Sequence, residues 1–520
     1  MRRLINSRVF TPDRRFCGNF RVAALFAAAL LSAAVIVKGE YDPGFIQVQL
    51  ADGYSIESVN ACYGTATRDS LPPLYLLTIP EGCDEQLLIT DMAADSARFV
   101  CVEHAYREET PEGVRQMIVA AVGGTIDQYW DQNVVERLHL PLIQGTAQGD
   151  GILVAVLDTG VLATHEALAG AIAPGGYDFI DNDAEPLDEA NGIDDDLDGQ
   201  IDEGSGHGTL VAGVIHLAAP GAQILPVRVL DDEGRGTTFA LAKGIRYAVE
   251  QGADIINMSL GLPEHSGVVA HELAQASLAS VGMVSAVGNL GVDSVQYYPA
   301  SDFRVLMVAA LDSMDVKADF SSYHAKVALS APGVGIMGPY YDGAYALGAG
   351  TSFSAAFISG QCALILDLLP SISADELYKI VEQGTIGIYH ITENQLYINR
   401  LGTGCFDGRE TLRAIGILAD VGPFDAEPWP IITPNPVMAG ETVYLALPDE
   451  AAGQGWVPAV ALYDIAGRRL HRFAPQPRQS VIAWDGSDRR GMRLAPGVYY
   501  LRVSGPRGAA WTNRVVVLSR

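Results

Sequence analysis

Between residues 150 and 415 the chain alternates short, continuously apolar stretches with helical ones, and this pattern constrains the fold more than any other feature. Strands that are apolar at consecutive positions are covered on both faces, as in parallel sheets with helical crossovers. The expected strands are ILVAVLD, ILPVRVL, DIINMSL, MVSAVGN, RVLMVAAL and KVALSAPG. The expected helices are TLVAGVIHLA, TFALAKGIRYAVEQG, VVAHELAQASLASVG and the run after Ser352. We therefore expect an α/β domain whose parallel sheet has helices on both faces.

Three reactive side chains stand at the ends of these elements. Asp158 follows an apolar strand, and His207 and Ser352 each open a helix among small residues. Singly, each has a structural explanation: a turn or cap for Asp158, a structural or metal-binding role for His207, and an N-cap for Ser352. Together they supply the hydroxyl, the base and the orienting carboxylate that nucleophilic hydrolysis requires.

Their sequence contexts strengthen this interpretation. The blocks DTGV at 158–161, HGTLVAGVI at 207–215 and GTSFSAA at 350–356 resemble the signature blocks of the subtilisin-like serine proteases. The order Asp, His, Ser matches that family and differs from the orders in chymotrypsin-like proteases and α/β-hydrolases. The resemblance covers about 150–415 and implies a subtilisin-like fold acting on polypeptide substrates. One departure lies in the nucleophile block, where Ala356 and Phe357 replace the family's usual proline and histidine.

The resemblance also implies roles for other residues. Asn289 stands where the family carries its oxyanion-hole side chain, and the backbone N–H of Ser352 would be the second donor. One segment resembles the edge that pairs with an extended substrate, and another resembles the opposite wall of the pocket for the residue before the cut. These two substrate-binding segments are Ser259, Leu260 and Gly261, and Ala286, Val287 and Gly288. They carry no charge, which favours a broad or apolar preference.

An acidic insertion precedes His207. Residues 178–203 hold twelve Asp or Glu and no Lys or Arg, so a bound divalent cation would offset their repulsion. Alternate oxygen ligands followed by a glycine form the first half of a calcium loop, although the loop is not an EF-hand because Ser205 occupies its twelfth position. A solvated acidic loop is the alternative. The candidate Ca²⁺ ligands are Asp194, Asp196, Asp198, Gln200, Asp202 and Glu203.

The N-terminal third divides into three parts. Residues 1–39 combine a basic start with the apolar run Val22–Val37, a pattern typical of a signal peptide rather than a membrane anchor. Residues 40–110 predict a small α+β domain that resembles the inhibitory propeptide of these proteases; an unrelated module is the alternative. Residues 111–149 are expected to be a linker or activation segment, with processing between about 107 and 145. Disulfide connectivity among the six cysteines is left open.

The C-terminus changes composition again. Residues 420–436 are rich in proline and predict a linker, and 437–520 contain short alternating strands. This segment is expected to be an all-β sandwich that resembles the Ig-like modules with which secreted bacterial proteins are sorted or anchored. It could contact the cell surface or the secretion machinery.

The whole chain is therefore interpreted as a bacterial, secreted or cell-surface serine endopeptidase made as a zymogen. Its net charge of -28 argues against a nucleic-acid partner. Its own propeptide is the expected intramolecular partner. Two alternatives remain: a catalytically silent, calcium-binding surface protein that uses the protease fold as a scaffold, and a calcium-dependent structural module whose hydrolytic activity is incidental.

Overall fold

The structure is a computed structural model of the 520-residue chain. It describes residues 40–110, 118–119, 123–195, 197–293, 297–417, 431–433, 437–438, 443–446, 459–464, 469–473, 481–487, 492–495, 497–504 and 510–518. The predicted signal peptide lies outside the described residues. The chain divides into two compact units, Met1–Ala419 and Asp420–Arg520, which are described separately.

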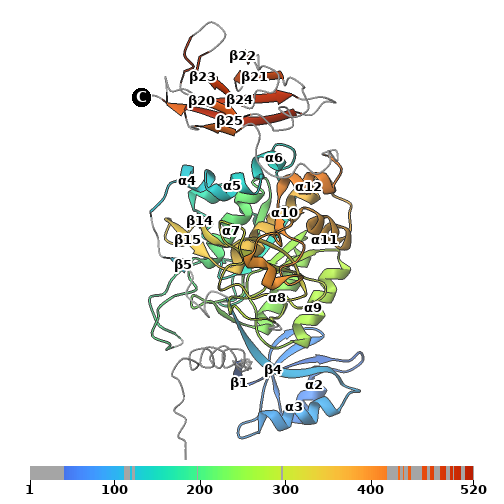
Figure 1. Ribbon diagram of the computed structural model, residues 1–520. Coiled ribbons are helices and arrows are strands. Elements are labelled where there is room, and N and C mark those ends of the chain that lie inside the picture. The colour runs from blue at the N-terminus through green and yellow to red at the C-terminus, as the bar shows by residue number, and fades with distance from the viewer. Residues whose placement is uncertain are drawn as a thin grey trace, which may run out of the picture. The chain divides into compact units, whose positions relative to one another are not determined.

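A nine-stranded sheet forms the centre of the first unit (Figure 1). Its strand order is β16-β17-β13-β12-β11-β10-β6-β8-β7, and every pairing is parallel except that of the edge strand β16. The expected parallel sheet is confirmed. The strands are β6 (Leu153–Asp158), β7 (Tyr177–Asp178), β8 (Gln223–Arg228), β10 (Ile255–Met258), β11 (Gly282–Ala286), β12 (Leu306–Leu311), β13 (Val327–Pro332), β16 (Thr385–Ile386) and β17 (Cys405–Phe406).

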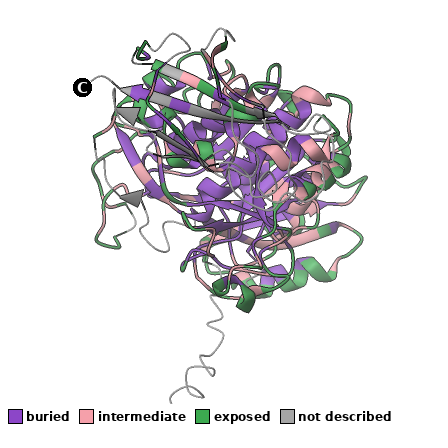
Figure 2. Ribbon diagram, turned by 45° about the horizontal axis from the view of Figure 1, so that its top comes forward, coloured by how far each residue is buried: buried purple, intermediate pink, exposed green. Residues whose placement is uncertain are grey.

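Helices cover both faces of this sheet because successive strand side chains point to opposite sides. In β6, Val154 and Val156 belong to one hydrophobic core, and Ala155 and Leu157 belong to another. The first core also contains α7 (His207–Ala218) and α10 (Thr351–Leu368), and the second contains α8 (Thr238–Glu250) and α9 (Gly267–Leu278). Figure 2 shows the resulting buried interior. Helices α11 (Ala374–Gln383) and α12 (Gly408–Ala414) follow α10 in the chain and add residues to the first core.

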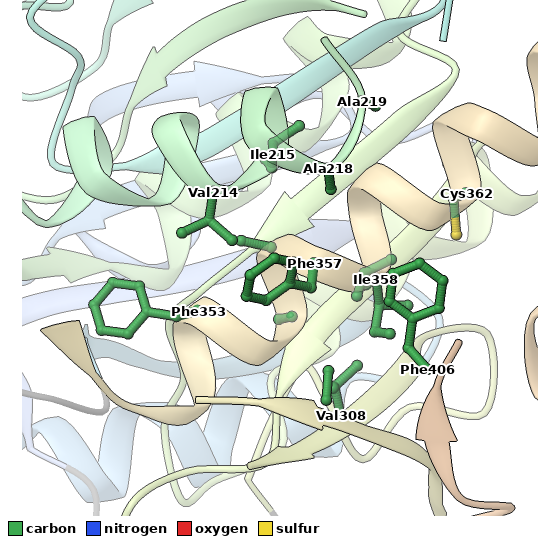
Figure 3. Packing of buried hydrophobic residues seen from close by; sticks show 14 of the residues in the cluster. Val214, Ile215, Ala218, Ala219, Val308, Phe353, Phe357, Ile358, Cys362 and Phe406 are labelled. Carbon is green, nitrogen blue, oxygen red and sulfur yellow. The ribbon is translucent and has the colours of Figure 1, made fainter. Parts of the chain in front are cut away.

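Helix α10 has 18 residues and is almost entirely buried. It is long and apolar enough to cross a membrane, but 83% of it is buried inside the fold, as in the core helix of a globular domain. Its Phe357, which replaces the family's histidine, packs with Phe353 and Ile358 near Val214 of α7 (Figure 3). The helix runs unbroken through Ala356, so the missing proline does not shorten it.

Part of the predicted linker belongs to the core of the α/β domain, which corrects the expected boundary at residue 150. Three short helices, α4 (Ile126–Trp130), α5 (Asn133–Arg137) and α6 (Leu140–Gln144), occupy this stretch. Tyr129 is fully buried in the first core and donates a hydrogen bond to the carbonyl of Gly213 in α7 (2.6 Å). The core therefore recruits apolar side chains that precede β6, and the sequence pattern alone did not assign them to it.

The N-terminal segment forms its own α+β layer and joins the central α/β domain. Its elements are β1 (Tyr41–Leu50), α2 (Ile56–Tyr63), β2 (Ala66–Leu71), β3 (Leu74–Thr78), α3 (Glu85–Ala94) and β4 (Phe99–Glu109). Its sheet has the order β2-β3-β1-β4-β9, and the last strand, β9 (Arg235–Thr237), belongs to the central α/β domain. A second extension of this kind occurs where β5 (Ile118–Val119) pairs with β15 (Tyr345–Ala349), which in turn pairs with β14 (Val334–Pro339).

The described part of the second unit contains only strands. They form two sheets, with orders β18-β20-β23 and β19-β25-β24-β21-β22. Val460, Leu462, Trp484 and Leu501 form part of the core. Strand β18 lies within the predicted linker at 420–436. The strands are β18 (Ile431–Thr433), β19 (Val437–Met438), β20 (Val443–Ala446), β21 (Ala459–Asp464), β22 (Arg469–Phe473), β23 (Val481–Trp484), β24 (Gly497–Ser504) and β25 (Ala510–Leu518).

The cysteines do not form disulfides among the residues that the structure describes. Cys62 and Cys83 are exposed, Cys101 is half-buried, and Cys362 and Cys405 are buried, all as free thiols. Cys17 lies outside those residues.

Candidate active site

The three predicted catalytic residues stand at the ends of core elements. Asp158 is the last residue of β6, His207 is the first residue of α7, and Ser352 is the second residue of α10. All three are buried, with relative exposures of 0%. The carboxyl ends of parallel strands and the following helix starts are where α/β folds gather reactive groups.

Asp158 and His207 form a direct pair. Asp158 Oδ1 lies 2.6 Å from His207 Nδ1 and also accepts the backbone N–H of Thr159 (2.8 Å). A carboxylate at this distance requires a proton on Nδ1, so the neutral imidazole presents Nε2 as its basic nitrogen. This tautomer is the one that a general base for a hydroxyl needs.

Ser352 lies at the start of an 18-residue helix, against the end of β10. Its Oγ lies 3.4 Å from the carbonyl oxygen of Ser259, and the hydroxyl of Ser259 donates to the Ser352 carbonyl (3.2 Å). The Ser259 hydroxyl also accepts from Asn257 (2.9 Å). These contacts tie the predicted nucleophile to the central sheet, and the helix N-terminus favours negative charge beside it.

Asn289 is held in a defined orientation beside the helix start. Its Oδ1 accepts the backbone N–H of Thr351 (3.1 Å) and the Thr351 hydroxyl (2.9 Å). Thr351 in turn accepts from the N–H of Gly288 (3.2 Å). Because the amide oxygen accepts both bonds, the amide nitrogen of Asn289 is the group that can donate elsewhere, which is the property that an oxyanion donor needs.

A buried carboxylate that the sequence analysis did not single out joins the Asp158 and His207 segments. Asp188 Oδ1 accepts from the Thr159 hydroxyl (3.2 Å) and the Gly206 N–H (2.8 Å). Its Oδ2 accepts from the backbone N–H (3.0 Å) and the hydroxyl (2.6 Å) of Thr209. The only signal in the sequence is its place in the acidic insertion, which it shares with eleven other acids. Burial raises the pKa of Asp188 to about 6, although its hydrogen bonds oppose that rise.

The glycines of the two catalytic blocks permit this close packing. A Cβ on Gly208 would lie 2.1 Å from the carbonyl oxygen of Gly160, so any larger residue after His207 would separate the two segments. Gly160 has a positive φ (104°), and a Cβ there would lie 2.7 Å from the backbone of Leu187. The spacing of Asp158 and His207 is thus set by backbone contact.

The predicted substrate-binding segments follow adjacent strands. Ser259, Leu260 and Gly261 follow β10, and Ala286, Val287 and Gly288 end or follow β11. The two strands pair in parallel, so both segments leave the sheet at the same edge. Strand β9 pairs with an extended segment from the N-terminal layer. Arg107, Glu108 and Glu109 of β4 lie antiparallel to it. The Thr110 N–H continues this pairing by donating to the carbonyl of Gly234 (3.0 Å).

The acidic insertion does not gather its predicted calcium ligands into one cluster in the described part of the chain. Asp194 accepts the N–H groups of Asp198 and Gly199, and Asp202 accepts those of Asn191 and Gly192. Among the described residues no group of three His, Cys, Asp or Glu side chains could hold a metal ion. The predicted ligand Asp196 lies outside the described residues.

Two other predicted ligands, Gln200 and Glu203, make side-chain contacts with acids other than Asp194. The side chain of Gln200 donates to Asp198 (2.8 Å). Glu203 interacts instead with the carboxyl of Glu233, which lies in the turn before β9. Burial and this neighbour raise the pKa of Glu203 to about 8. The residues have the oxygen chemistry of a calcium site, but the described side chains are not arranged as one.

Comparison with known proteins agrees with this geometry. Residues 149–400 match the Subtilase family. The chain is 35% identical over 240 residues to thermitase from Thermoactinomyces vulgaris, an alignment that covers 44% of this chain and 80% of thermitase. The chain is a subtilase. It is accordingly a serine endopeptidase, and the predicted family and enzyme class are confirmed.

Two further relatives extend the comparison. The subtilase is 32% identical over 379 residues to M-protease from Shouchella clausii, covering 71% of this chain and 91% of M-protease. Its fold resembles that of fervidolysin from Fervidobacterium pennivorans, with a TM-score of 0.59 and 22% identity over 93% of this chain and 78% of fervidolysin. This structural likeness supports the fold alone.

Proposed function

We propose that this subtilase hydrolyses peptide bonds through Asp158, His207 and Ser352. Ser352 Oγ attacks the scissile carbonyl as His207 Nε2 takes its proton, and the resulting imidazolium donates from Nδ1 to Asp158. The carbonyl oxygen becomes an oxyanion, to which Asn289 and the Ser352 N–H donate. His207 then protonates the leaving amine, and an acyl-enzyme on Ser352 remains. Water, activated by the same histidine, releases the acid.

The observation that carries this proposal is the 2.6 Å contact between Asp158 and His207, in a core that also buries Ser352. The test compares the wild type with Ser352→Ala by intact mass and N-terminal sequence of the exported protein. If only the wild type loses its N-terminal segment and reacts with a serine-directed fluorophosphonate, the proposal stands. A wild type that keeps the segment and does not react favours the silent-scaffold alternative.

We further propose that residues 40–110 are the propeptide. Glu103 of β4 supports this role because its carboxylate accepts three bonds at the start of α9, from the Ser266 hydroxyl (2.6 Å) and the N–H groups of Gly267 (2.8 Å) and Val268 (3.2 Å). A carboxylate at a helix N-terminus is stabilised by the helix dipole. We expect the mature N-terminus between β4 and α4, because α4 is part of the peptidase core.

We also propose that Ca²⁺ binds the loop around Asp194, Asp196, Asp198, Gln200 and Asp202. Hard oxygen donors and a glycine with positive φ at Gly199 (96°) suit such a loop. When bound, the ion would neutralise the insertion that leads into His207. Glu203 faces Glu233 and is the least suited of the predicted ligands. Calorimetric titration of the Ser352→Ala protein with Ca²⁺ tests the site independently of activity.

For the termini we propose export and surface association. The support is the signal-like sequence at 1–39 and the two described sheets of the C-terminal unit, which are compatible with an Ig-like sandwich. Cell fractionation of the full chain beside a form truncated after residue 419 tests this. Loss of surface association on truncation supports an anchoring role, and unchanged distribution contradicts it.

A further inference from the structure

The two predicted walls of the pocket for the residue before the cut are lined by glycine. Gly261 follows β10 and Gly288 follows β11, and both leave the sheet at the edge where Ser352 lies. A glycine wall normally leaves room for a substrate side chain between the two segments, because it contributes no side chain of its own. The content of that space therefore decides which side chain can enter.

The ring of Tyr297 occupies the space beside both glycines. A Cβ built on Gly261 would lie 2.3 Å from Cε1 and 2.6 Å from Cδ1 of Tyr297, so the ring rests directly on this backbone. A Cβ built on Gly288 would lie 3.4 Å from Cγ of the same ring, which is ordinary contact distance. One aromatic ring thus touches both walls, and only 6% of the residue is exposed.

The backbone around Tyr297 is anchored, so the ring is not attached to a free loop end. Leu262, next to Gly261, and Tyr298 exchange two backbone hydrogen bonds, each 2.8 Å long. The Ser301 N–H donates to the Tyr297 carbonyl (2.8 Å). Moving the ring out of the space would require breaking the attachment of this segment to the first wall, or a change of side-chain rotamer in a close-packed surrounding.

We propose that Tyr297 fills the pocket between Gly261 and Gly288 and restricts this subtilase to substrates with a small residue, Gly, Ala or Ser, immediately before the scissile bond. This inference rests on the proposed function and replaces the broad or apolar preference expected from the uncharged walls. Gly261 and Gly288 have no side chains, and Leu260 and Val287 belong to the hydrophobic cores, so the ring of Tyr297 is the group that excludes large residues. A branched or aromatic substrate side chain would overlap it.

The test uses peptide substrates that differ only at the residue before the cut, with Ala, Leu, Phe or Lys at that position. For the wild type we expect kcat/KM for Ala to exceed that for Phe by about tenfold or more, the range that steric selection in an apolar pocket supplies. Tyr297→Ala should raise kcat/KM for Phe by about tenfold and change that for Ala only a few-fold. Tyr297→Phe keeps the ring and is the matched control. It should retain the wild-type ratio of kcat/KM for Ala to that for Phe.

Equal cleavage after Ala and Phe by the wild type would overturn the inference, as would an unchanged ratio in Tyr297→Ala. If Tyr297→Ala does not fold, the wild type alone decides the question. Mass spectrometry of its cleavage products from denatured casein should place Gly, Ala or Ser before most cuts, and a majority of large residues there would refute the role of Tyr297. Absence of any cleavage, with no labelling of Ser352 by a fluorophosphonate, would count against the proposed function itself.

Discussion

The buried carboxylate of Asp188 makes a quantitative prediction about stability and pH. Burial raises its pKa from 3.8 to about 6 in the folded protein. Since the folded pKa is the higher one, the stabilising contribution is complete below the unfolded value of 3.8 and is lost as pH rises through about 6. The loss corresponds to about 3 kcal/mol of unfolding free energy. Asp188→Asn cannot titrate and should not show it.

The assay is thermal unfolding at pH 4.5 and pH 7.5, in a Ser352→Ala background that prevents self-digestion. At either pH the variant replaces one carboxylate oxygen by an NH₂ group and so loses the acceptor for one of the two N–H groups, Gly206 or Thr209, which costs about 1–3 kcal/mol. Between the two pH values the parent should lose about 2 kcal/mol relative to the variant, because pH 4.5 already lies above the unfolded pKa of 3.8, and this corresponds to about 5 °C in melting temperature for a domain of this size. The destabilisation caused by Asp188→Asn should therefore shrink at neutral pH.

A matched control is Asp178→Asn, which removes another buried carboxylate of the same insertion. Asp178 pairs with Arg228 (2.8 Å), and within the described part of the chain its carboxylate has no hydrogen bond to the segments that carry Asp158 and His207. It reports the general cost of losing a buried acceptor in this region. If the melting difference caused by Asp188→Asn is the same at both pH values, or grows at neutral pH, the argument from burial is refuted.

Three further predictions concern the site and its regulation. Asn289→Ala should lower kcat by about 10²- to 10³-fold with little change in KM, because the proposed oxyanion donor would act in the transition state. Steady-state kinetics measures this, and a rise in KM with unchanged kcat would contradict it. Burial of Glu108 at the end of β4 raises its pKa well above the usual range. Because rising pH favours the charged form, which is disfavoured in this buried position, the segment 40–110 should be released more readily as pH rises. Glu108→Gln should keep it bound at pH 8, as seen by gel filtration after processing, and equal release would count against this. Thorough chelation should lower the melting temperature of the wild type and leave Asp194→Asn/Asp198→Asn unaffected; no effect on either protein would exclude the calcium loop.

The sequence alone was sufficient for the central sheet and the catalytic candidates, for a local reason. Continuous apolar strands, glycines beside His207 and small residues around Ser352 are patterns that a few adjacent residues carry, and each predicts its own strand end or helix start. Their order along the chain then indicated the family. The same locality explains why the acidic insertion was recognised as a group but not residue by residue.

Tertiary structure decided which side chains act on that framework. Asp188 differs from the other acids of its insertion only because folding places it between Thr159 and Thr209, and Tyr297 matters only because its ring meets Gly261 and Gly288 from a distant part of the chain. Tyr129 likewise joined the peptidase core from a stretch that looked like a linker. Such roles depend on contacts between segments far apart in sequence, and neither composition nor periodicity records which distant surfaces will meet.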